Sequence, residues 1–242
     1  MDVGKALSFV FEDEEWVTKI LLGAVIALIP IFGGLALMGY AIAVVRNVIA
    51  GHDRPLPAWD DLGNYFKDGL MFWITTVIYA LPLLILICPI GLVWILPAIG
   101  GEQEDLIAIL TGVAGVVSAG LGCLAALYGI LLALLTPVVQ IRFAETEDIG
   151  ACLRLGDIFR FLFANIGSVI ISQILLFVAG TVITSVIGGV GGFFGIIPIC
   201  GWVLAAALGL LLLPASVWLT VFSSHLYGQI GRQSGTTPTP VV

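Results

Sequence analysis

Two short polar stretches bring together residue types that are able to act chemically. The first, residues 51–61, reads Gly-His-Asp-Arg-Pro-Leu-Pro-Ala-Trp-Asp-Asp and offers an imidazole, a guanidinium, an indole and three carboxylates. Arg54 can pair with either Asp60 or Asp61 through a charge-assisted hydrogen bond. We expect Asp60 to cap the following helix by accepting bonds from its first backbone N–H groups, and Trp59 suits the headgroup region of a membrane.

This first stretch has two interpretations, one structural and one functional. In the structural interpretation, which we favour, the two prolines hold the chain extended ahead of a capped helix. In the functional interpretation, the stretch is a cytoplasmic docking loop for a protein partner or a lipid headgroup. The candidate docking residues are Asp53, Arg54, Trp59, Asp60 and Asp61.

The second stretch, residues 12–15, consists of four acidic residues. Because negative charge is stabilised at a helix amino terminus, we expect these acids to precede a helix rather than to bind a cation. His52 and His225 have no nucleophile or metal partner nearby in the sequence, and the four cysteines show no CxxC spacing. The sequence therefore predicts no catalytic, cofactor-binding or metal-binding residue, and we expect the protein not to be an enzyme.

The rest of the chain is strongly apolar, and this decides the fold class. Apolar residues make up 60% of the chain and charged residues 10%, against about 25% charged in ordinary soluble domains. Asp, Glu, Lys and Arg are absent from residues 20–45, 69–101, 106–141 and 161–231. A spanning helix needs about 20 apolar residues. The sequence therefore predicts an all-α integral membrane protein.

Three similar motifs interrupt these apolar stretches, each with a proline followed by a glycine. They contain Pro30 and Gly33, Pro89 and Gly91, and Pro198 and Gly201. Proline ends or kinks a helix, and glycine permits a reversal, so we interpret each motif as the break of a helical hairpin. Six membrane helices are then predicted, near residues 14–29, 34–50, 68–88, 108–141, 162–187 and 200–227. The glycines between residues 188 and 195 are predicted to form the loop between the last two.

Short polar segments precede the second and third breaks and resemble each other. Residues 62–67 and 155–160 share Leu, Gly and Phe at matching positions, and each ends in a base. We expect such segments to form short amphipathic helices at the membrane surface. The organisation is then a single helical membrane domain over residues 1–232, with a disordered tail over residues 233–242.

The number of spans has an alternative, because Pro30 can also be a kink within one helix, which leaves five spans. Six spans put all nine Lys and Arg residues on one membrane face, and cytoplasmic loops are enriched in these residues. We therefore favour six spans in the cell membrane with both termini in the cytoplasm. Residues 14–29 would rise only about 24 Å, less than the roughly 30 Å hydrocarbon core, so the first hairpin is expected to be shallow.

The stretch at residues 51–61 also carries a family resemblance. Together with Phe11-Glu12-Asp13, Trp16 and Ile29-Pro30-Ile31, it resembles the family catalogued as domain of unknown function 4013. The similarity extends from residue 2 to about residue 227. It implies a prokaryotic multi-helix membrane protein without an assigned activity, and it carries over no catalytic or binding residues.

The expected function is that of a membrane-organising, lipid-handling or partner-binding protein without a catalytic site. The net charge of −7 leaves no basic stripe for nucleic acid. Membrane lipids are the expected partners, a protein partner or a homo-oligomer stays open, and no cofactor is expected. The alternative is a small transporter or channel, because interrupted helical hairpins resemble those with which transporters build binding sites.

Overall fold

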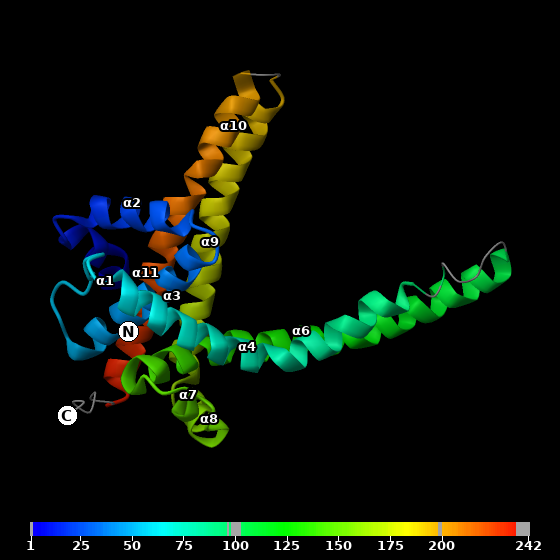
Figure 1. Ribbon diagram of the computed structural model, residues 1–242, viewed down its shortest axis with the longest axis horizontal. Coiled ribbons are helices and arrows are strands. Elements are labelled where there is room, and N and C mark those ends of the chain that lie inside the picture. The colour runs from blue at the N-terminus through cyan, green and yellow to red at the C-terminus, as the bar shows by residue number, and fades with distance from the viewer. Residues whose placement is uncertain (1, 96, 98–102, 198–199, 236–242) are drawn as a thin grey trace. The chain divides into compact units, whose positions relative to one another are not determined.

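The computed structural model describes residues 2–95, 97, 103–197 and 200–235, and Figure 1 shows that this part of the chain is built from helices. No strand occurs in these described ranges. The all-α fold class predicted from the sequence is therefore confirmed. Several of the helices are long and apolar, as a membrane protein requires.

The helices follow one another along the chain from α1 to α11. They are α1 (Val3–Ser8), the 3-10 helix η1 (Phe9–Glu12), α2 (Trp16–Ala27), α3 (Phe32–Ala50), α4 (Leu62–Val93), α6 (Glu104–Thr146), α7 (Ile149–Cys152), α8 (Leu155–Ala164), α9 (Ile166–Gly195), α10 (Cys200–Leu210) and α11 (Leu212–Gln233).

Five stretches within the described residues are long and apolar enough to cross a membrane. They are Phe32–Ala50, Leu62–Val93, Glu104–Thr146, Ile166–Gly195 and Cys200–Gln233. The helix predicted first, α2, is also apolar but has only 12 residues. It rises about 18 Å, so the choice between five and six spans stays a prediction.

The chain divides into two compact units. The first unit consists of Met1–Ile74 and Pro137–Val242, and the second unit is Thr75–Thr136. All nine Lys and Arg residues belong to the first unit. In the second unit, the later part of α4 pairs with the earlier part of α6, and the Tyr128 hydroxyl donates to the Tyr79 carbonyl oxygen at 2.8 Å. Its large apolar side chains are widely exposed, as expected of a surface that faces lipid.

The core of the first unit forms where α3 packs against α2 and α11, and α11 packs in turn against α9. Figure 1 shows α9 lying beside α10 and α11. The buried core combines side chains from the amino-terminal helices with those of α3 and α11, among them Phe9, Val10, Tyr40, Val44, Val217 and Val221.

Glycines allow two helices of the first unit to approach at backbone distance. A Cβ atom at Gly39 of α3 would collide with the carbonyl oxygen of Tyr65 in α4. A Cβ atom at Gly69 of α4 would collide in the same way with the carbonyl oxygen of Leu35. Small residues at a helix crossing let backbones approach in lipid, so these two positions hold α3 and α4 together.

The chain reverses direction at the first proline motif. Helix α2 ends at Ala27 and α3 begins at Phe32. Between them Ile31 has a φ of 64°, a conformation that is strained for a β-branched residue. Gly33 lies so close to the backbone of Ile26 that a Cβ atom would collide with its carbonyl oxygen. This reversal depends on both the strained residue and the glycine.

The second proline motif differs from the prediction, because α4 continues through it. Pro89 and Gly91 lie inside α4, which ends at Val93 rather than at residue 88. Proline is tolerated in a membrane helix when other groups satisfy the freed carbonyl, and in α4 only the last turn of the helix follows it. Pro89 therefore does not end the helix, and any reversal comes after it.

The third motif falls partly outside the described residues, since Pro198 is not among them. Gly201 lies in the first turn of α10, and a Cβ atom there would collide with the carbonyl oxygen of Phe194. The glycines between residues 188 and 195 do not form a loop, contrary to expectation, because they lie inside α9. A helix satisfies backbone polar groups that lipid cannot. At the carboxyl end, α11 includes Gln233, and residues 236–242 of the predicted tail lie outside the described residues.

Candidate functional site

The stretch predicted as a docking loop is bound closely to the helices of the first unit. Each of four successive carbonyl oxygens accepts a hydrogen bond from a side chain of α2, α3 or α4. The bonds are Asn47 Nδ2 to Pro55 O (3.0 Å), Lys19 Nζ to Leu56 O (3.1 Å), Tyr40 Oη to Pro57 O (3.0 Å) and Tyr65 Oη to Ala58 O (2.8 Å). Extended backbone without a neighbouring strand needs such partners when it is buried, so this arrangement favours the structural interpretation of the loop.

Trp59 lies in the protein core and not at a membrane surface, which corrects the expectation for this residue. Only 8% of it is exposed. Its ring stacks on Tyr40 with centroids 4.1 Å apart, and its Nε1–H donates to the Lys19 carbonyl oxygen at 2.8 Å. A buried tryptophan needs such a partner for its N–H, and α2 supplies it.

The charged residues of the loop point to separate partners. Arg54 pairs with Glu14 at 3.1 Å rather than with Asp60 or Asp61, and both partners are mostly exposed (61% and 82%). The cap of α4 comes from Asp61, whose Oδ1 accepts the Asn64 N–H at 3.4 Å. The cap lies one residue later than expected because α4 begins at Leu62.

Asp13, in the acidic stretch before α2, takes part in a buried ion pair. Its Oδ2 lies 2.7 Å from Lys19 Nζ, and its Oδ1 accepts the Glu15 N–H at 2.9 Å. Burial alone would raise the pKa of Asp13, but the bonds from Lys19 and Glu15 outweigh it and hold this pKa below its ordinary value of 3.8. Asp13 therefore fixes the amino end of α2 against the loop. Both of its carboxylate oxygens are bound within the protein.

The two histidines line one polar pocket, of about 420 Å³, together with Asp2, Asp53 and Arg232. His225 is buried, stacks on Phe9 with ring centroids 4.0 Å apart, and has Nδ1 3.1 Å from Gln229 Nε2. Gln229 in turn exchanges two hydrogen bonds with the backbone of Asp2. These contacts fasten α1 to α11. Among the described residues, no group of three His, Cys, Asp or Glu side chains is arranged to hold a metal ion.

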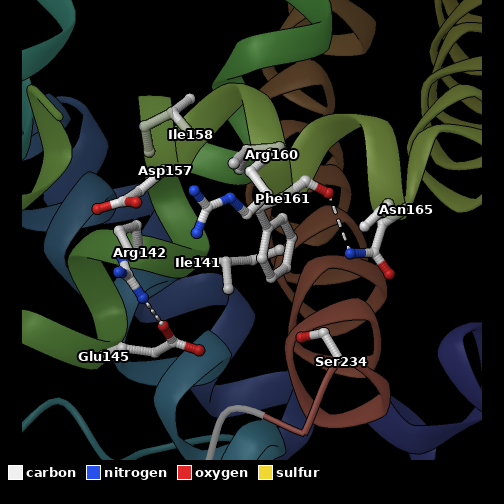
Figure 2. Close-up of a pocket in the computed structure, with 11 residues that line it drawn as sticks. Ile141, Arg142, Glu145, Asp157, Ile158, Arg160, Phe161, Asn165 and Ser234 are labelled. Atoms are coloured by element: carbon white, nitrogen blue, oxygen red, sulfur yellow. Dashed lines mark hydrogen bonds and ion pairs between the residues drawn. The ribbon is translucent and has the colours of Figure 1, made fainter. Parts of the chain in front are cut away.

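A second pocket, of about 290 Å³, lies where α6 ends and α8 begins to cover it (Figure 2). Four charged side chains line it: Arg142 and Glu145 from α6, and Asp157 and Arg160 from α8. Arg142 Nη1 lies 3.4 Å from a carboxylate oxygen of Glu145, which is only 7% exposed. Figure 2 shows the Arg142, Asp157 and Arg160 side chains directed into the same part of the pocket.

Two of these charged groups have no protein partner. In the part of the chain that the structure describes, the side chains of Asp157 and Arg160 form no hydrogen bond or ion pair. The Nε of Arg142 is buried and likewise has no hydrogen-bond partner among the described residues. Buried polar groups are normally paired. That rule concerns the Arg142 Nε, whereas Asp157 is half-buried and Arg160 is exposed, so the pocket holds a carboxylate and a guanidinium group that a ligand can reach.

The wall of the pocket is apolar and continues onto an amphipathic helix. Val138, Ile141, Phe161 and Ala164 line the pocket beside the charged groups, and Asn165 and Ser234 complete it. Helix α8 buries Ile158 and Leu162, and it leaves Leu155 and Phe163 exposed. An amphipathic helix that leaves large apolar side chains exposed on one side is typical of the surface zone of a membrane.

Sequence reasoning did not find this pocket. Asp157 and Arg160 belong to the repeated segment at residues 155–160, and Arg142 ends the longest apolar helix, but nothing in the sequence linked them. They meet because the short α7 turns the chain back, with Asp148 capping it through bonds to the Gly150 and Ala151 N–H groups at 3.0 Å. An Asp directly before the first residue of a helix is a recognisable capping signal.

The comparisons with known proteins identify a family and name no activity. A family described as "Protein of unknown function (DUF4013)" matches residues 22–191. A stretch of 88 residues is 30% identical to an uncharacterized protein of Methanocaldococcus jannaschii, and it covers 34% of this chain and 30% of that relative. The chain thus spans less than a third of the length of the curated relative that it matches. No solved structure matches the chain.

Proposed function

The chain belongs to this family, and we propose that it is a non-enzymatic, lipid-handling membrane protein that binds phospholipid headgroups in the pocket of Figure 2. The observation that supports this most is the position of Arg142 and Arg160 beside an apolar wall. Arginine is suited to phosphate because its planar guanidinium presents several N–H donors in a fixed geometry.

The apolar part of the pocket supports a lipid rather than a free phosphate. Val138 and Ile141 on α6 and Phe161 on α8 lie directly beside the charged groups. A phospholipid presents the same two chemistries, a charged headgroup and an apolar chain, next to each other. Lipid-binding sites that combine basic residues with apolar surface occur between membrane helices near the headgroup level.

The proposal includes an orientation in the cell membrane. The end of the first unit that carries the pocket would face the cytoplasm, with both termini on that side, because Lys and Arg are enriched in cytoplasmic loops. Reporter fusions at Asp148 and after Gln233 test this orientation. An outside signal at Asp148 would contradict it.

Lipid binding is testable with the purified full-length chain in detergent. Native mass spectrometry against a short-chain phospholipid should show that Arg160→Gln weakens binding about tenfold or more, as expected for loss of a charge-assisted contact. Arg154→Gln is the matched control, since Arg154 is exposed, directly precedes α8 and does not line the pocket. Both variants should keep the wild-type thermal stability, because neither side chain has a partner among the described residues.

The comparison of these two arginines decides the proposal. If both substitutions weaken binding equally, the effect is general surface charge and the pocket is not the site. If neither changes binding, Arg160 does not contact the lipid. Only a selective loss in Arg160→Gln supports the pocket as the headgroup site.

A further inference from the structure

The headgroup pocket is electrically balanced, which is unusual for a site that binds only an anion. Two guanidinium groups, on Arg142 and Arg160, share the pocket with the carboxylates of Glu145 and Asp157. A purely anionic headgroup would gain from the arginines, but it would also lie beside two negative charges. A like charge that is brought close costs free energy in a partly buried site.

Pairing within the pocket separates the occupied groups from the available ones. Arg142 and Glu145 neutralise each other through their contact at 3.4 Å. Asp157 and Arg160, three residues apart on α8, form no ion pair within the described part of the chain. The side chains without an ion-pair partner are therefore the carboxylate of Asp157 and the guanidinium of Arg160, while Arg142 keeps only its buried Nε–H unpaired.

The spacing of these two groups fits a particular ligand chemistry. Side chains three residues apart share a helix face, with Cβ atoms about 5–6 Å apart. A phosphate joined to an ammonium group by two carbons separates its two charges by a similar amount. The phosphate would contact Arg160, the ammonium would contact Asp157, and the acyl chains would lie along the apolar wall.

We propose that the pocket selects a zwitterionic headgroup with a phosphate and a primary ammonium, as in phosphatidylethanolamine, because Arg160 and Asp157 face the pocket unpaired. This selectivity rests on the proposed function. A primary ammonium donates N–H bonds to a carboxylate, whereas the quaternary ammonium of phosphatidylcholine has no N–H to donate. Phosphatidylglycerol has no cation to match Asp157.

The test is a competition among three short-chain lipids on the full-length protein in detergent. Phosphatidylethanolamine should bind about tenfold more tightly than phosphatidylcholine or phosphatidylglycerol, the size expected for one hydrogen-bonded charge contact. In Asp157→Asn this preference should fall to about twofold or less, while phosphatidylcholine binding stays unchanged. Asp157→Glu keeps the charge and should retain the preference, which separates loss of the contact from damage to the fold.

The outcomes distinguish the selectivity from the function on which it rests. Equal binding of the three lipids, all weakened by Arg160→Gln, leaves the headgroup site standing and overturns the selectivity. No binding of any lipid overturns both. Phosphoethanolamine without acyl chains identifies the source of the ligand. If it competes as well as the lipid does, the site recognises the free zwitterion and not a membrane component.

Discussion

Lys19 offers the sharpest test of how the first unit holds the loop at residues 51–61. Its ammonium group lies 2.7 Å from Asp13 Oδ2 and donates to the Leu56 carbonyl oxygen at 3.1 Å, so one side chain joins α2, the acidic stretch and the loop. Lys19→Met keeps most of the length of the side chain and removes its charge. The substitution leaves a largely buried carboxylate, 8% exposed, without its cation.

The size of the effect follows from burial. At 2.7 Å and an effective dielectric constant of about 20, the attraction within the pair is about 6 kcal/mol before desolvation is subtracted. Desolvation cancels much of this, so the pair contributes little net stability, but removing one partner from a buried pair costs about 3–5 kcal/mol. We expect Lys19→Met to lower the free energy of unfolding by that amount.

Two further variants and a series of pH values complete the experiment. For each, the free energy of unfolding is measured in detergent with increasing denaturant. Asp13→Asn combined with Lys19→Met should recover most of the loss, because no charge is left unpaired. Arg54→Gln removes the exposed pair with Glu14 and should cost about 0–1 kcal/mol. The pKa of Asp13 is lowered in the folded state, so its stabilisation is present above pH 3.8 and is lost as the pH falls through the folded pKa.

The difference between wild type and Lys19→Met should therefore shrink below that pH. A double variant as unstable as Lys19→Met would refute the reasoning, because the cost would then not come from the unpaired carboxylate. A loss equal to that of Arg54→Gln would show that burial does not distinguish the two ion pairs.

Three other predictions concern packing, capping and thiol chemistry. Gly39→Val should lower the free energy of unfolding by about 3 kcal/mol, because the new side chain would collide with the α4 backbone. Gly34 has open space around it, so Gly34→Val is the control and should change the melting temperature little. Asp61→Ala should lower the free energy of unfolding by about 1 kcal/mol through loss of the α4 cap, and Asp60→Ala should lower it by less. If denaturant unfolding gave the reverse order, Asp61 would not be the cap. Burial raises the pKa of Cys152 to about 12, so at pH 8 a maleimide should label it only after unfolding, as read by peptide mass spectrometry.

The helices were predictable because membrane insertion depends on local composition. Each predicted helix overlaps one in the structure, since an apolar stretch of sufficient length excludes charge wherever the rest of the chain lies. The separation of the nine Lys and Arg residues from the long apolar stretches was equally predictable, because it can be read directly from the sequence. The number of spans was not predictable, because α2 is too short for its composition to decide whether it crosses the membrane.

The proline motifs show where local sequence stops being sufficient. Pro30 and Pro89 have the same following residue, yet the chain reverses after Pro30 and stays helical through Pro89. At Pro30 the reversal brings Gly33 against Ile26, so α3 packs on α2, with the strained Ile31 at the turn between them. No such contact appears in the motif itself.

The loop and the pocket were decided by tertiary structure for the same reason. Trp59 looked like an interfacial residue, but Tyr40 and Lys19, far away in the sequence, make it part of the core. Arg142 and Arg160 became one site only when α7 turned α8 back over the end of α6. Insertion into lipid is a sum of local transfer free energies, which the sequence alone determines. A site depends on which distant side chains meet. For the loop this was decided by packing among α2, α3 and α11, and for the pocket by the position of α8 beside the end of α6.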